Sequence, residues 1–87
     1  MWYDDDYKKW ADEGCPINAE VVGLEVSNSK IKSLEPIKNL INLKSLFCNS
    51  NKIKSLEPLQ DLIKLKRLDC LDNDIQSLEP IKNLINL

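Results

Sequence analysis

Apolar residues recur along this chain in a pattern that repeats every 22 residues. The pattern is clearest in residues 43–65, where the repeated apolar positions are separated by intervals of two or three, apart from one interval of five between Cys48 and Ile53. The tetrapeptide SLEP also recurs, at residues 33–36, 55–58 and 77–80. The repeated columns are Leu24/Leu46/Leu68, Val26/Cys48/Cys70, Ile31/Ile53/Ile75, Leu34/Leu56/Leu78, Ile37/Leu59/Ile81, Leu40/Leu62/Leu84 and Leu43/Leu65/Leu87. A fixed period of this length predicts a solenoid, in which each repeat folds only by stacking on its neighbours.

Each repeat is expected to contain one short strand, because two of its apolar positions lie two residues apart. These strands are Leu24–Val26, Leu46–Cys48 and Leu68–Cys70. Alternation directs these side chains inward and their neighbours to a concave outer face, and successive strands should form a parallel sheet. The apolar residues from Ile31 to Leu43 then recur every third position, which predicts 3₁₀-like or short helical turns on the convex side.

A polar residue follows each predicted strand and is expected to hold the turn. Asn51 and Asn73 occupy this position in the second and third repeats, where a buried amide can satisfy backbone groups that would otherwise lack a partner. The first repeat has Ser29 instead. Because its side chain is shorter, we expect that turn to be less well tied.

Residues 1–23 do not follow the repeat and are expected to form a helical cap. Asp4–Asp6 can begin a helix, and Gly14 is placed to end it. Tyr3, Tyr7 and Trp10 fall on one face of that helix, which would cover the open end of the first strand. The alternative interpretation is that these three residues and Trp2 form a ligand-stacking or peptide-binding surface.

The segment LKSLFCNSNKIKSLEPLQDLIK resembles the 22-residue leucine-rich repeats of the phosphatase-regulator and internalin type. This resemblance implies an α/β repeat fold, a short curved leucine-rich-repeat solenoid with a parallel concave sheet, a 3₁₀ or short-helix convex side and an N-terminal helical cap. We expect the cap at residues 1–23 and the repeats at 24–45, 46–67 and 68–87. Two segments are also similar to leucine-rich-repeat proteins of large amoeba-infecting DNA viruses: WADEGCPINAEVVGLEVSNSKI and LEPIKNLINLKSL. The family implies a module that binds other macromolecules and is rarely catalytic.

The composition argues against several classes of function. A net charge of −2, from 12 basic and 14 acidic residues, gives no electrostatic footprint for nucleic acid or a membrane surface. Without histidine, a serine or cysteine nucleophile lacks its usual base, so we expect no enzyme activity, metal or cofactor. Three cysteines form no paired framework, which favours an intracellular location, in the cytoplasm or, for a viral protein, the host cytoplasm.

Cys48 and Cys70 share a column and should lie one strand spacing apart, about 4.8 Å. That distance suits a disulfide, but neighbouring parallel strands seldom offer the required dihedral angle. We therefore interpret them as two buried thiols that pack as small apolar residues.

The outward strand positions predict a protein-binding surface. Phe47 lies at its centre between acidic neighbours, and exposed aromatic anchors of this kind often dominate the energy of an interface. The predicted partner-binding residues are Phe47, Glu25, Asp69, Leu71, Arg67 and Asn49.

The last repeat is expected to expose apolar side chains and a sheet edge, because Leu87 occupies the column of Leu43 and Leu65 and no polar cap follows. One interpretation is a homodimer in which two such ends stack; the other is a truncated piece of a longer array. The residues predicted to mediate self-association are Leu84, Leu87, Ile75 and Leu78.

Overall fold

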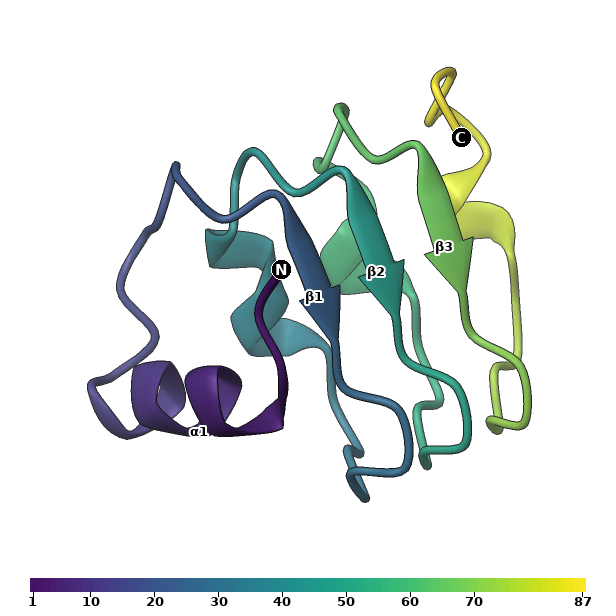
Figure 1. Ribbon diagram of the computed structural model, residues 1–87. Helices are drawn as coiled ribbons and strands as arrows, with labels where there is room; N and C mark the ends of the chain where they lie inside the picture. Colours follow the sequence, from purple (N-terminus) through teal and green to yellow (C-terminus); the bar gives the residue numbers. More distant parts are fainter.

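The computed structural model describes all 87 residues as a short solenoid, with a parallel sheet on one side and 3₁₀ helices on the other (Figure 1). The sheet has the order β1-β2-β3. The chain runs through α1 (Asp4–Asp12), β1 (Gly23–Glu25), η1 (Glu35–Asn39), β2 (Ser45–Phe47), η2 (Glu57–Leu59), β3 (Arg67–Asp69) and η3 (Glu79–Ile81). The predicted fold class is therefore confirmed, and each strand begins one residue earlier than the sequence pattern suggested.

The register of the sheet follows the repeat. Leu24 pairs with Leu46 and Leu46 pairs with Leu68, so equivalent residues of successive repeats lie side by side. The inward side chains of Leu24 and Leu46 join the 3₁₀ layer in one core of 16 buried residues, and Leu68 packs against this core. Most leucines and isoleucines of the first two repeats are 0% exposed, whereas Leu68 of the third is only partly buried. Stacking between repeats thus supplies the core that one repeat lacks.

The turn that follows each strand is held by side-chain hydrogen bonds. The Asn51 amide donates to the carbonyls of Val26 and Cys48, both at 3.0 Å. The shorter side chain of Ser29 predicted a less well tied first turn, but this prediction is wrong. Ser29 forms hydrogen bonds both to the next repeat and to the cap helix. Its N–H donates to Asn51 Oδ1 at 2.9 Å, and its hydroxyl donates to Asp4 Oδ1 at 2.8 Å. The next repeat and the cap helix together replace the missing asparagine.

Each 3₁₀ helix begins with the same serine interaction. In all three SLEP segments the serine hydroxyl accepts a hydrogen bond from the backbone N–H of the glutamate, at 3.0–3.1 Å. The proline that follows fits the first turn, where a missing N–H costs little. The recurrence of SLEP is thus explained by the start of each convex segment.

The N-terminal cap is built around Trp10, which is 3% exposed and packs at the first repeat. Its indole N–H donates to the Pro16 carbonyl at 2.9 Å, and the rings of Trp2 and Tyr7 lie 5.9 and 5.8 Å away. Gly14 follows the end of α1 with φ 93°, a conformation that glycine adopts without strain. The predicted cap is present with Trp10 at its centre.

Tyr3 does not belong to the buried aromatic stripe, contrary to the expectation from its spacing. It precedes α1 and is 58% exposed. Trp2 takes its place, because the backbone of Trp2 adds to the sheet beside β1. The Trp2 N–H donates to the Gly23 carbonyl and the Glu25 N–H donates to the Trp2 carbonyl, both at 2.8 Å. Figure 1 shows this N-terminal segment running along the free side of β1.

The third repeat is more open than the first two, but the expectation that Leu84 is exposed there is wrong. Leu84 is 5% exposed, because its side chain packs into the core of the preceding repeats. Leu78 and Leu87 are exposed, and Ile75 is partly buried. On the far side of β3 no further strand is paired. None of the helices is both long enough and apolar enough to span a membrane.

Candidate interaction surface

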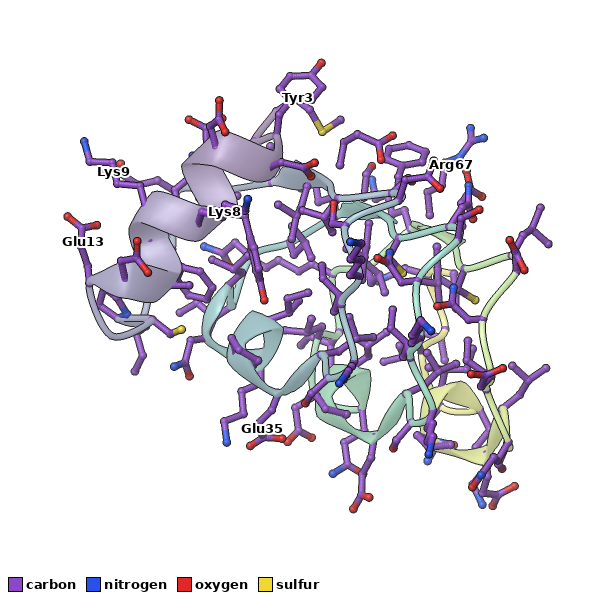
Figure 2. All side chains as sticks on the ribbon, turned by 90° about the horizontal axis from the view of Figure 1, so that it is seen from below. Tyr3, Lys8, Lys9, Glu13, Glu35 and Arg67 are labelled. Atoms are coloured by element: carbon purple, nitrogen blue, oxygen red, sulfur yellow. The ribbon has the colours of Figure 1, made fainter.

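The outward side chains of the three strands share one face of the sheet. Because the register aligns Glu25 with Phe47 and Phe47 with Asp69, these residues form a row across the strands. Figure 2 shows Tyr3 and Arg67 projecting from the same side of the molecule, whereas Glu35 of η1 lies at the opposite side. The structure therefore brings most of the predicted partner-binding residues together.

Phe47, Arg67 and Asp69 form one contacting group on this face. The Arg67 guanidinium lies over the Phe47 ring, 5.3 Å from its centroid. Arg67 Nη2 also lies 3.4 Å from Asp69 Oδ2. An aromatic ring and a carboxylate both stabilise a guanidinium. The Arg67 guanidinium is therefore stabilised by contacts within this chain, before any partner protein binds.

The other predicted residues play different parts. Leu71 is 76% exposed and adds an apolar side chain next to β3. Asn49 accepts the Leu71 N–H at 2.8 Å through its side-chain oxygen, so its amide is engaged in joining two repeats. Glu25 accepts the Ser27 N–H through Oε1 at 2.9 Å, which fixes the direction of its carboxylate. Glu25 and Leu71 are thus available for contact, whereas Asn49 is partly committed to the fold.

The sequence prediction missed Tyr3 as a member of this face. Since Trp2 pairs with Leu24, the residue after Trp2 falls beside Glu25 and turns outward as Glu25 does. Tyr3, Glu25 and Ser27 line a hollow at this end of the face, together with Asp4 and Asp5 from the start of α1. The signal was present in the sequence, because Trp2 and Tyr3 lie one repeat length before Leu24 and Glu25.

The comparisons with known proteins agree with this architecture. A family model described as leucine-rich repeats (two copies) matches residues 21–62. The chain has the leucine-rich-repeat fold. A search of curated proteins finds no match.

Two solved structures of Listeria monocytogenes share this leucine-rich-repeat fold. An internalin C2 superposes with a TM-score of 0.77 and 33% sequence identity over 79% of this chain. A second internalin, InlF, gives a TM-score of 0.76, with 33% identity over 79% of this chain. The matched part corresponds to only 30% and 20% of those two proteins, so the chain spans less than a third of either. The similarity to viral repeat proteins stays a prediction.

All three cysteines of this chain are free thiols. Cys48 is buried, and burial, with smaller effects from Cys70, Asp69 and Glu25, raises its pKa to about 12. Cys70 is only partly buried, contrary to the prediction of two buried thiols, and burial and then the Asp69 charge also raise the pKa of Cys70. Both thiols are therefore neutral near pH 7, which suits the predicted apolar packing and disfavours nucleophilic chemistry.

Proposed function

We propose that this leucine-rich-repeat protein is a non-enzymatic interaction module that binds another protein through the concave face of its sheet. The observation that carries the proposal is Phe47, an aromatic side chain at the centre of that face that lies only partly buried beneath Arg67. Leucine-rich-repeat domains generally mediate protein–protein interactions, and the internalin neighbours are consistent with that role. Hot spots of interfaces are enriched in aromatic residues and arginine.

The composition of the face supports the same function. Phe47 and Leu71 offer apolar contact area, while Glu25, Arg67 and Asp69 supply charges around them. An apolar centre with a polar rim is the usual anatomy of a protein interface. By contrast, the hollow between η1 and η2 on the convex side is lined mostly by polar and charged residues.

A second candidate function is self-association along β3, and the free edge of that strand supports it. Antiparallel pairing of two β3 strands with Leu68 on the two-fold axis would place Arg67 of each copy opposite Asp69 of the other. Trp2 already occupies the free side of β1, so such pairing would close at two copies and could not continue into a fibre. Leu78 and Leu87 would supply apolar contacts nearby, and Ile75 and Leu84 would support them from within.

Charge exchange tests this second candidate. In light scattering, Arg67→Asp and Asp69→Arg should each lower the dimer fraction, and the double exchange should restore it. A wild-type chain that stays monomeric at millimolar concentration would exclude self-association.

We further infer an intracellular location, because all three cysteines are free thiols.

A selected ligand tests the main proposal. Peptides selected from a random library on the wild-type chain can be titrated into ¹⁵N-labelled protein. The expected amide shifts lie at the outward residues of β1–β3. Shifts confined to the convex segments around η1 and η2 would contradict a concave binding surface.

A further inference from the structure

The concave face contains one complete cation-binding group and a second that lacks its cation. In the first, the guanidinium of Arg67 lies over the Phe47 ring and beside the Asp69 carboxylate. In the second, Tyr3 provides a ring and Glu25 a carboxylate, and no lysine or arginine lines the hollow between them. In the first group, the combination of a ring and a carboxylate thus binds an arginine side chain.

The spacing of the row suits a planar cation. The bridge between Trp2 and Leu24 places the Tyr3 backbone beside Glu25, and Glu25 pairs with Phe47, so the backbones that carry the two rings lie about two strand spacings apart, roughly 9.6 Å. A cation on the Glu25 carboxylate would then lie next to the strand position that carries the Tyr3 ring, and a cation and a ring attract over ~6 Å. Tyr3 is 58% exposed and can receive such a group on its face.

The carboxylate at the centre is already oriented. Glu25 Oε1 is held by the Ser27 N–H at 2.9 Å, and Oε2 has no protein donor. Asp4 and Asp5 add negative charge at the rim of the hollow, with Asp4 fixed by the Ser29 hydroxyl at 2.8 Å. A neutral or acidic partner would leave these carboxylates uncompensated, whereas a cation complements them.

We propose that an arginine side chain of the protein partner binds in this hollow, with its guanidinium against the Tyr3 ring and on the free oxygen of Glu25. Arginine fits better than lysine, because its planar guanidinium stacks on rings and donates in a fixed direction to a carboxylate. This inference rests on the proposed concave binding function and names the chemistry of its partner. It also makes Tyr3, which the N-terminal segment adds to the sheet, part of the binding surface.

The test uses a blocked tripeptide, acetyl-Gly-Arg-Gly-amide, titrated into the ¹⁵N-labelled full chain at fixed ionic strength. A matched peptide carries citrulline, which has nearly the same shape as arginine but no charge. The arginine peptide should give saturable amide shifts at Tyr3, Glu25 and Ser27, and the citrulline peptide should not. Glu25→Gln and Tyr3→Ala should each raise its Kd about two- to fivefold, and Tyr3→Phe should leave it unchanged.

The control variant is Glu57→Gln, which removes an exposed carboxylate from the convex side. Equal shifts from the two peptides, the absence of saturable shifts at the hollow, or an equal loss in Glu57→Gln would each overturn the arginine site. Those results would leave the proposed function intact, because binding of a library-selected ligand through Phe47 does not require the hollow. Loss of Phe47-dependent binding would instead remove the proposed function itself.

Discussion

Asn51 and Ser29 connect two repeats through one hydrogen bond, in which the Ser29 N–H donates to Asn51 Oδ1 at 2.9 Å. The same oxygen accepts the Ile31 N–H at 3.0 Å, and the amide nitrogen donates to the Val26 carbonyl. One side chain therefore satisfies three backbone groups of the preceding repeat. Its 8% exposure means that little water can replace these bonds.

Asn51→Ala is consequently expected to destabilise the fold by about 2–4 kcal/mol, since each buried polar group left without a partner costs roughly 1–3 kcal/mol. Asn73→Ala should cost less, about 1–2 kcal/mol, because Asn73 lies in the more exposed third repeat. Urea unfolding of both variants measures the difference. Equal losses would contradict the stronger role of Asn51, and a loss below about 1 kcal/mol for Asn51→Ala would show that Asn51 does not connect the repeats as described.

Trp10 should be the most sensitive position of the cap. Trp10→Ala removes a buried ring that is 3% exposed and the donor to the Pro16 carbonyl, so we expect a loss of about 3–5 kcal/mol. Tyr3→Ala, at an exposed ring, should stay within about 0.5 kcal/mol. Thermal unfolding followed by circular dichroism compares them. Similar midpoints for the two variants would contradict the cap assignment.

Ser50 offers a stabilising substitution. Its φ is 56°, in the left-handed region, and the equivalent residues Asn28 and Asp72 have φ 56° and 54°. Asparagine and aspartate tolerate this region better than serine does. Ser50→Asn should therefore stabilise the fold by about 0.5 kcal/mol, and the β-branched Ser50→Val should destabilise it. A lower unfolding midpoint for Ser50→Asn than for wild type would contradict this account.

The buried thiol of Cys48 predicts a pH dependence. Its pKa is raised to about 12, so the folded state disfavours the thiolate relative to the unfolded chain. The resulting stability is present below pH 9 and is lost as the pH rises toward 12, at up to about 1.4 kcal/mol per pH unit. Cys48→Val, which places the residue found at Val26 in the same column, should remove this contribution. Urea unfolding of both chains from pH 8 to 11 measures it; identical slopes would contradict the burial of the thiol.

The repeated part of the fold was predictable because the same apolar columns specify the strand, the turn and the 3₁₀ segment three times. Leu24, Leu46 and Leu68 lie beside one another as the period requires. Errors arose where the pattern changes. The helical spacing of Tyr3, Tyr7 and Trp10 suggested one stripe, but the pairing of Trp2 with Leu24 separates Tyr3 from the helix and turns it outward.

The candidate surface was predictable only in part, for a physical reason. Alternation along a strand assigns Glu25, Phe47 and Asp69 to one face, which the register confirms. It does not say which side chains the fold itself uses, so the bond from Asn49 to the Leu71 N–H and the placement of Arg67 over Phe47 required the structure. Leu84 was misjudged similarly, because packing against the preceding repeats buries it although its own repeat is open.

The most direct test of concave binding is the affinity of a library-selected ligand for three chains: wild type, Phe47→Ala and Ile63→Ala. Ile63 is a matched control, since its side chain is apolar, 66% exposed and outside the strands. Isothermal titration calorimetry should show that Phe47→Ala weakens binding by about 30-fold or more, as expected for a hot spot of 2 kcal/mol, while Ile63→Ala changes it less than about twofold. Unchanged affinity for Phe47→Ala in a folded protein would contradict binding through the concave face.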